Sequence, residues 1–170
     1  MIKRIKPIKL LIMDVDGVMT DGSVIYNDRG EETKFFNVRD GHGIKMLQRA
    51  GIKAAIITAR QSDVVKHRAK NLGIELLYQG AIEKAKAYDD LLEKEGFKTE
   101  ETAYMGDDVV DIPVLKRAGL AICVPDAVDE VKQRVHYITM KPGGKGAVRE
   151  VVELILKAQG RWDEAVKKYL

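Results

Sequence analysis

The segment LLIMDVDGVMTDG, residues 10–22, joins a run of four apolar residues to a loop that contains three aspartates. A short, continuously apolar run that stops at a polar loop is typical of a strand buried on both faces of a parallel sheet. Four further runs of this kind follow along the chain, at residues 54–57, 76–78, 103–105 and 120–124. The sequence therefore predicts a sheet built around buried strands.

Amphipathic stretches separate these runs. They are residues 43–50, 62–72, 82–95, 109–117 and 126–135, with a strongly apolar helix expected at 147–158. Alternating strands and helices predict an α/β fold of the Rossmann type, an open parallel sheet sandwiched by helices. Residues 23–36 interrupt this order as strand, turn and strand, so we expect a β-hairpin inserted after the first strand. We expect one domain over residues 1–170, with a polar tail from about residue 159.

Composition narrows the classes of function. The 170 residues carry 29 basic and 26 acidic side chains, and a formal charge of +3 is too small and too scattered for a nucleic-acid-binding surface. No apolar run is long enough to span a bilayer, and the one that ends at Met13 is too short for a signal peptide. The single cysteine, Cys123, excludes an internal disulfide. These features predict a cytoplasmic protein without nucleic-acid or membrane partners.

Polar side chains follow four of the predicted strands. In chain order they are Asp14 and Asp16, then Thr58, then Lys84, and finally Asp107, Asp108 and Asp111. Each alone is commonplace, because such residues often cap helices or form turns. Ligands of an open α/β sheet bind beyond the carboxyl ends of its strands, so we expect these side chains to share one site. Clustered carboxylates repel one another unless a cation binds, and hard oxygen ligands favour Mg²⁺.

These residues resemble the four motifs of the haloacid dehalogenase superfamily of phosphatases. The first motif reads DVDGVMTDG at residues 14–22, Thr58 and Lys84 mark the second and third, and the fourth reads GDDVVD at residues 106–111. The resemblance implies hydrolysis of a phosphate monoester, with Mg²⁺ as cofactor and an aspartyl phosphate as intermediate.

In that reaction Asp14 would attack phosphorus, which splits one difficult hydrolysis into two easier steps. Asp16 would protonate the leaving sugar oxygen and later deprotonate the attacking water. Thr58 and Lys84 would bind the phosphoryl oxygens. The implied metal ligands are Asp14, the main-chain carbonyl of Asp16 and Asp107, with Asp108 and Asp111 behind them as orienting residues.

Three further segments resemble the 3-deoxy-D-manno-octulosonate 8-phosphate phosphatases, a capless group within the superfamily. They read FNVRDGHG at residues 36–43, YQG at 78–80 and GGKGAVRE at 143–150. The resemblance implies hydrolysis of that eight-carbon sugar acid phosphate during the synthesis of lipopolysaccharide precursors. Phosphatases of related nine-carbon sugar acid phosphates are similar and remain the alternative, as does a relative that binds phosphate without turnover.

The same resemblance implies a set of substrate-binding residues. They are Asp16, Asn37, Val38, Arg39, Asp40, Gly41, Lys45, Arg60, Arg68 and Lys84. We expect Arg39 to lie in the loop after the hairpin and to bind the sugar carboxylate, because arginine forms two parallel hydrogen bonds with a carboxylate. Asn37 would bind sugar hydroxyls.

Other phosphate-handling proteins fit less well. A receiver domain would carry an aspartate after its third strand, where this chain reads YQG at residues 78–80. A dinucleotide-binding domain needs Gly-x-Gly-x-x-Gly directly after a strand, a context that the glycines at 41–43 and 143–146 lack. A phosphomutase of the same chemistry typically carries a cap, and the segment 14–58 has room only for the hairpin and one helix.

Without a cap the site would be open to water, so we expect neighbouring subunits to complete it. The hairpin places Val24 and Tyr26 on one strand and Phe35 on the other, and these side chains need a covering surface. We expect a homo-oligomer, and the resemblance implies a tetramer with the four hairpins in a central barrel. The tail, which contains Trp162, would then fold over the substrate in its own or a neighbouring subunit.

Overall fold

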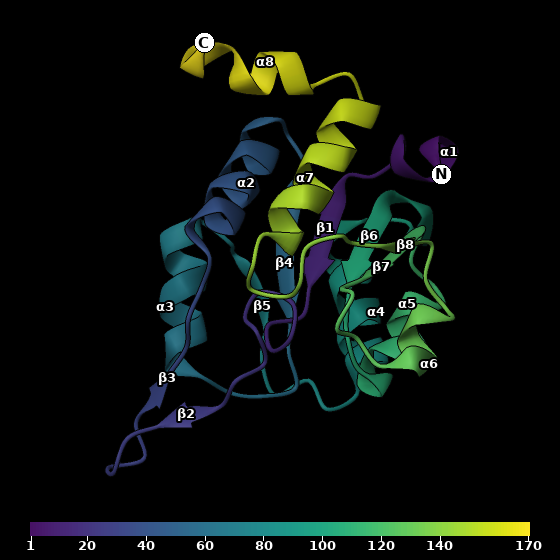
Figure 1. The fold of residues 1–170 in the computed structure, drawn as a ribbon. Helices are drawn as coiled ribbons and strands as arrows, with labels where there is room; N and C mark the ends of the chain where they lie inside the picture. The colour runs from purple at the N-terminus through teal and green to yellow at the C-terminus, as the bar shows by residue number, and fades with distance from the viewer.

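The computed structural model describes residues 1–170 and contains a six-stranded sheet flanked by helices (Figure 1). The strand order is β5-β4-β1-β6-β7-β8, and every neighbouring pair is parallel. The bounds are β1 Leu10–Met13, β4 Lys53–Ile57, β5 Leu76–Tyr78, β6 Thr102–Met105, β7 Leu120–Cys123 and β8 Tyr137–Ile138. The Rossmann-like sandwich expected from the sequence is confirmed, with β8 as an additional edge strand.

Strand β1 lies in the middle of the sheet, between β4 and β6. All four of its residues are completely buried, which explains why this stretch is continuously apolar. The chain moves outwards from β1 to β5 and then returns to the other side of β1 to form β6, so the connections diverge at β1. The loops that follow β1, β4 and β6 therefore meet at one edge of the sheet.

Helices connect the strands. They are α1 Ile2–Ile5, α2 Val38–Arg49, α3 Asp63–Leu72, α4 Lys84–Glu95, α5 Ile112–Leu115, α6 Asp129–Lys132, α7 Ala147–Ala158 and α8 Trp162–Val166, with 3-10 turns η1 Thr99–Glu101, η2 Val109–Asp111 and η3 Lys167–Tyr169. Helices α2 and α7 pack side by side on one face of the sheet (Figure 1), and right-handed crossovers require α4 and α5 to cover the other face. No helix combines the length and apolar character needed to cross a membrane.

Helix α2 begins at Val38 rather than at Gly43, the start expected from the sequence. Asn37 caps it, because the side-chain oxygen accepts hydrogen bonds from the N–H groups of Arg39 and the next residue. Glycine lowers helix propensity, which obscured the true start. Gly43 allows α2 to pack closely against α7, since a Cβ there would lie 3.0 Å from the side chain of Arg149 in α7. The expectation that Arg39 lies in a loop is therefore wrong, because it lies in the first turn of α2.

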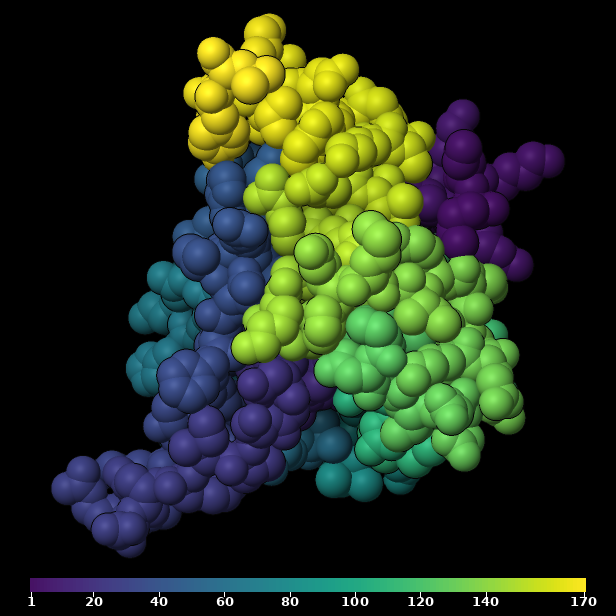
Figure 2. Space-filling view, in the orientation of Figure 1, coloured from purple at the N-terminus to yellow at the C-terminus, as the bar shows by residue number.

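The hairpin consists of β2 Ile25–Tyr26 and β3 Glu32–Thr33 and projects from the body of the molecule (Figure 2). Its strands are shorter than the sequence indicated for residues 23–36. Asn27 shapes the turn, because its side-chain oxygen accepts hydrogen bonds from the N–H groups of residues 29 and 31.

Apolar side chains of the hairpin and its flanks face solvent. Phe35 is 68% exposed, Tyr26 55% and Val24 51%. A two-stranded hairpin with such a surface is marginal on its own in water. The segment thus presents an apolar surface away from the core of its own chain.

Two helices of the carboxyl half are shorter than the sequence indicated. The expected helix at 109–117 is the turn η2 followed by the four-residue α5, with Pro113 in the first turn of α5. The expected helix at 126–135 is only α6. Ala127 is buried in the loop before α6 and shares the apolar spacing of a helix, which made the second pattern look longer than it is.

The tail folds back onto the ends of α2 and α7, at the edge of the sheet opposite the loops that follow the strands (Figure 1). Trp162 packs against the chain, with the Lys157 ammonium 4.8 Å from its ring centroid. The Tyr169 hydroxyl lies 2.9 Å from His42 Nε2 and accepts a hydrogen bond from Arg49. The tail thus lies away from the site of its own chain, and only the expected closure over a neighbouring subunit stays a prediction.

The loop before α7 packs directly on the loop that follows β1. The N–H of Gly144 donates to the carbonyl of Val18 at 3.0 Å. A Cβ at Gly143 would lie 1.9 Å from the carbonyl oxygen of Gly17, so no residue with a side chain fits there without displacing one of the two loops.

Candidate active site

A hollow of about 310 Å³ lies where the loops after β1, β4 and β6 meet the start of α4. Its lining residues are Asp14, Asp16, Gly17, Gly22, Thr58, Ala59, Arg60, Lys84, Asp107, Asp108 and Val110. The structure therefore brings together the strand-end residues that the sequence placed in one site. Their separate catalytic roles stay predictions.

An ion pair fixes the carboxylate at the end of β1. Lys84 is 2% exposed, and its Nζ lies 2.6 Å from Asp14 Oδ2 and 2.6 Å from Asp111 Oδ1. The other oxygen of Asp14 accepts a hydrogen bond from the N–H of Val15 at 2.7 Å. A buried ammonium is stable only when paired and hydrogen-bonded, so the three side chains hold one another in place.

Asp111 organises the loop after β6. Its Oδ1 accepts hydrogen bonds from Lys84 and from the hydroxyl of Tyr104, the latter at 2.6 Å. Its Oδ2 accepts from the N–H groups of Asp107 and Asp108, at 3.1 and 3.2 Å. Burial raises the pKa of the Tyr104 phenol well above its usual value, so this hydroxyl remains a donor. Sequence reasoning missed Tyr104, because a tyrosine inside an apolar strand is typical of the core.

Carboxylates crowd around the single ammonium of Lys84. Oxygens of Asp14, Asp107 and Asp111 lie within 4.8 Å of one another. Burial raises the pKa of Asp14 to about 6, with Asp111 adding to the shift and Lys84 opposing it. Burial, and then the charges of Asp111 and Asp14, raise the pKa of Asp107 to about 7. Both shifts indicate negative charge that the protein's own cations do not fully compensate.

This donor set suits a hard divalent cation. Each oxygen of Asp111 accepts two hydrogen bonds, whereas each oxygen of Asp14 accepts only one, which leaves Asp14 and Asp107 as the carboxylates with free acceptor capacity. Gly17 allows their close approach, because a Cβ there would lie 2.0 Å from Asp107 Oδ2. Mg²⁺ commonly uses one or two carboxylates and completes its shell with water or phosphate. The residues therefore fit Mg²⁺ at Asp14 and Asp107, next to the main chain of Asp16.

The carboxylate of Asp16 lies close to two charged hairpin residues that the sequence did not bring into the site. Lys34 and Glu32, from the hairpin, contact each other at 3.2 Å, and Lys34 also contacts Asp16 at 2.5 Å. Arg60 donates to Glu32 at 2.9 Å. A signal was present in the spacing of residues 32 and 34, which puts both side chains on one face of an extended segment.

Two residues predicted to bind substrate act as helix caps instead of lining the hollow. Asn37 caps α2, as described above. Asp40 is 3% exposed and caps α7, because its carboxylate accepts hydrogen bonds from the N–H of Arg149 at 2.7 Å and of Gly146 at 3.3 Å. These contacts give Asp40 a structural task that the sequence did not indicate.

Arg68 also supports the start of α2. It donates to the carbonyl of Asn37 at 3.2 Å, and its guanidinium lies 5.3 Å from the centroid of the Phe36 ring. A Cβ at Gly41 would lie 2.4 Å from the Arg68 guanidinium, so glycine leaves room for it. Arg68 and Gly41 thus lie where α3 packs against the start of α2, outside the hollow of their own chain.

The remaining predicted substrate-binding residues also lie outside the hollow. Val38 is 80% exposed, and Lys45 is half-buried further along α2. Arg39 lines a separate hollow of about 510 Å³ together with Lys141 and Lys145. Within one chain, Asp16, Arg60 and Lys84 are the predicted substrate contacts that the structure brings together.

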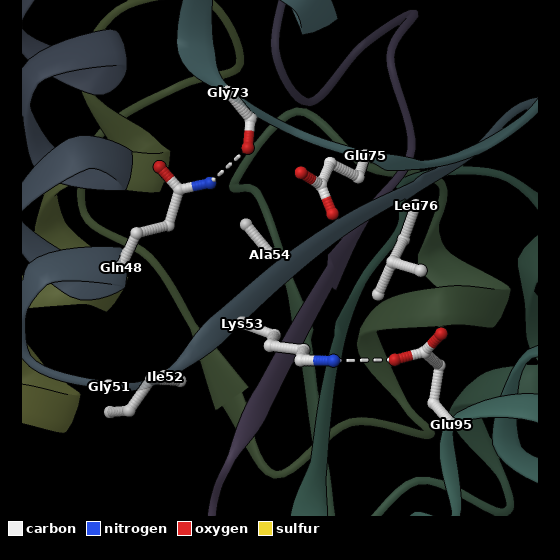
Figure 3. A pocket seen from close by; sticks show the side chains of 9 residues that line it. All are labelled: Gln48, Gly51, Ile52, Lys53, Ala54, Gly73, Glu75, Leu76 and Glu95. Atoms are coloured by element: carbon white, nitrogen blue, oxygen red, sulfur yellow. Dashed lines mark hydrogen bonds and ion pairs between the residues drawn. The ribbon is translucent and has the colours of Figure 1, made fainter.

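A further hollow of about 440 Å³ lies at the opposite edge of the sheet, around the amino ends of β4 and β5 (Figure 3). Lys53 and Glu95 pair across it at 2.6 Å, and Gln48 donates to the carbonyl of Gly73 at 2.9 Å. Glu75 lines the hollow without a drawn partner, and none of the predicted site residues lies there. The predicted motif residues therefore gather at the hollow beyond the carboxyl ends of the strands and not at this one.

Known proteins with similar sequences are phosphatases of the kind that the strand-end carboxylates indicate. A family model of haloacid dehalogenase-like hydrolases matches residues 74–151. The chain is 48% identical over 164 residues to the 3-deoxy-D-manno-octulosonate 8-phosphate phosphatase KdsC of Escherichia coli K12, a match that covers 96% of this chain and 87% of that protein.

Solved structures are similar over nearly the whole chain. The phosphatase of this name from Moraxella catarrhalis, in complex with a magnesium ion, a phosphate ion and a KDO molecule, has a TM-score of 0.97 at 46% identity and covers 99% of this chain and 97% of that one. The cobalt-bound protein from Haemophilus influenzae has a TM-score of 0.90 at 45% identity, with 92% of each chain covered. Sequence identity, fold and the acidic strand-end site agree, and the chain belongs to the 3-deoxy-D-manno-octulosonate 8-phosphate phosphatase family of haloacid dehalogenase-like hydrolases.

Proposed function

We propose that this protein hydrolyses 3-deoxy-D-manno-octulosonate 8-phosphate to the free sugar acid and inorganic phosphate. The observation that carries the proposal is the arrangement around Asp14, whose carboxylate lines the strand-end hollow, contacts the Lys84 ammonium and lies close to Asp107. The ligands of the Moraxella catarrhalis relative support the choice of substrate.

In the first step, a carboxylate oxygen of Asp14 bonds to phosphorus while the bond between phosphorus and the sugar oxygen breaks. The leaving sugar oxygen takes a proton from Asp16. The Lys84 ammonium and the Thr58 hydroxyl bind phosphoryl oxygens, so that the developing charge meets groups already in position. The products of this step are the free sugar acid and an aspartyl phosphate.

In the second step, water attacks the phosphorus of the aspartyl phosphate. Asp16, which has given up its proton, now takes one from the attacking water. The bond between phosphorus and Asp14 breaks, which restores the carboxylate and releases inorganic phosphate. Asp16 ends the cycle protonated, as it began.

Asp14, Asp107 and the main-chain carbonyl of Asp16 would hold the Mg²⁺ ion. When bound there, the cation would offset negative charge on the transferred phosphoryl group. Asp111 holds Lys84 and the main chain at Asp107, so it fixes the geometry without binding the ion.

The proposed substrate is tested by phosphate release with Mg²⁺ present. We expect kcat/KM for 3-deoxy-D-manno-octulosonate 8-phosphate to exceed that for a nine-carbon sugar acid 9-phosphate by about tenfold or more, and that for glucose 6-phosphate by a larger factor. A higher kcat/KM for the nine-carbon substrate would establish the alternative instead. Absence of turnover with every phosphate ester would contradict the enzymatic proposal.

Mg²⁺ is expected to stabilise the fold as well as support turnover. Adding MgCl₂ to the chelator-treated protein should raise Tm by about 5–10 °C at a concentration far above Kd, because the cation binds the folded state and offsets the crowded carboxylates. Differential scanning calorimetry measures the shift. Asp107→Asn should abolish it, whereas Asp108→Asn should retain it, because the Asp108 carboxylate binds the N–H of Val109. An equal shift in both variants would place the ion elsewhere.

We propose further that the working form is a homo-oligomer, with a tetramer as the specific expectation. The exposed apolar side chains of the hairpin support association with another copy, because such a surface is unfavourable in water. Light scattering tests the proposal, and a fully active monomer would contradict it.

Kinetics after removal of residues 159–170 test whether the tail closes the site of a neighbouring subunit, and unchanged kinetics would exclude the tail from that site.

A further inference from the structure

A second group of charged side chains lies beside the acidic cluster, at the base of the hairpin. Lys34 Nζ lies 2.5 Å from Asp16 Oδ1 and 3.2 Å from Glu32 Oε1. The Lys34 side chain is 1% exposed, although the residue belongs to a segment that projects into solvent. A lysine ammonium is almost never this deeply buried unless it is paired, so its partners determine where it lies.

Glu32 is the fixed end of this group. One of its oxygens accepts a hydrogen bond from the Ser62 hydroxyl, and the other accepts from the Arg60 guanidinium at 2.9 Å. Ser62 is the N-cap of α3, so Glu32 is anchored to the main body of the fold. Lys34 therefore lies between an anchored carboxylate and the carboxylate of Asp16.

The contacts distinguish the two oxygens of Asp16. Lys34 binds Oδ1, whereas Oδ2 accepts no hydrogen bond from the protein, and Arg60 Nε lies 3.8 Å from it, beyond hydrogen-bond distance. Oδ2 is thus the oxygen left free to exchange a proton with a ligand in the hollow. A misplacement of about 1 Å in such a group can cost about a hundredfold in rate.

We propose that Lys34 is a positioning residue for Asp16, holding its carboxylate so that Oδ2 faces the reacting atoms while Glu32 anchors Lys34. This inference rests on the proposed function, because it concerns the proton transfers assigned to Asp16. It also gives the hairpin a role inside its own subunit, in addition to any contact between subunits.

The first test is Lys34→Met, which keeps the side-chain length and removes the ammonium. With the best alkyl phosphate substrate of the wild type, kcat should fall by about 10- to 100-fold and KM should change by less than about threefold. Lys53→Met is the matched control, because it breaks an ion pair of 2.6 Å at the opposite edge of the sheet. Its kcat should stay within about twofold of the wild-type value.

The decisive measurement is a double-mutant cycle with Asp16→Asn. If Lys34 acts through Asp16, adding Lys34→Met to the Asp16→Asn variant should change kcat by less than about twofold. A further 10- to 100-fold loss in that background would overturn the proposal, because Lys34 would then act independently of Asp16. If Lys34→Met does not fold, Lys34→Arg serves in the same cycle, since it retains the charge and moves the donors.

A leaving group that needs no proton gives an independent readout. 4-Nitrophenolate leaves without general acid assistance, so its pre-steady-state burst should be nearly unchanged in Lys34→Met, while the burst of sugar release slows. Equal slowing of both bursts would indicate general damage to the site and contradict the positioning role. Because the comparison uses any alkyl phosphate that the wild type hydrolyses, a wrong substrate assignment would leave this test intact.

Discussion

Asp14→Asn is expected to lower phosphate release by at least about 10⁴-fold, because an amide cannot replace a carboxylate as the nucleophile. The fold should survive the change. The amide oxygen can still accept a hydrogen bond from Lys84, which retains its contact of 2.6 Å with Asp111. Steady-state kinetics and an intact-mass measurement of the phosphorylated protein check this result, and the variant should show no covalent phosphate.

The same variant should be at least as stable as the wild type in metal-free buffer. Burial is the main cause that raises the pKa of Asp14 from 3.8 to about 6. A carboxyl group with a raised pKa in the folded state loses stabilising free energy as pH rises through that range. Asn carries no charge, so Tm above pH 6 should equal or exceed that of the wild type.

Asp129→Asn, on the exposed start of α6, is the matched control for both measurements and should change neither rate nor Tm appreciably. Substantial turnover by purified Asp14→Asn protein would contradict the assigned nucleophile. A large fall in its Tm would contradict the account of the crowded carboxylates.

Lys84→Met is expected to reduce both activity and stability. Loss of the ammonium removes a phosphoryl-binding group, and kcat/KM should fall by about 10³-fold. It also leaves Asp14 and Asp111 facing each other without their shared partner, and removing one member of a buried ion pair typically costs about 3–5 kcal/mol. Calorimetry and steady-state kinetics check the two losses.

Mg²⁺ should separate these two effects of Lys84→Met. The cation can offset part of the unpaired charge and restore part of the lost Tm, but it cannot supply the missing hydrogen bonds to the phosphoryl group. Lys86→Met, an exposed position in the same helix, should resemble the wild type in both respects. Turnover of Lys84→Met within about tenfold of the wild type would exclude a direct role for this ammonium.

The motif residues could be predicted from the sequence because the parallel sheet converts order along the chain into proximity. Asp14, Thr58 and Asp107 each follow a buried strand, so they had to meet at one edge. The central strands could be located for the same reason, since burial on both faces leaves a continuously apolar run.

Other parts of the site depend on packing that local patterns only partly indicate, such as the shared face of residues 32 and 34. Lys34 lies in a hairpin whose short strands do not reveal which face turns toward the hollow. Asp40 is one of the predicted substrate-binding residues, yet it caps a helix that begins more than a hundred residues later in the chain. The prediction that Arg39 lies in a loop was wrong because the glycines in the first turns of α2 lower helix propensity, so the pattern indicated a later start of the helix.

The contact of Gly143 and Gly144 with the loop after β1 has a consequence for protein design. Gly143 packs directly on the carbonyl of Gly17, and Gly144 donates a hydrogen bond to the carbonyl of Val18. The segment before α7 therefore supports the conformation of the loop that carries Asp16. If the loop after β1 were moved alone onto another α/β scaffold, it would lose this supporting contact. A designer would have to transfer both segments together, although about 120 residues separate them in the chain.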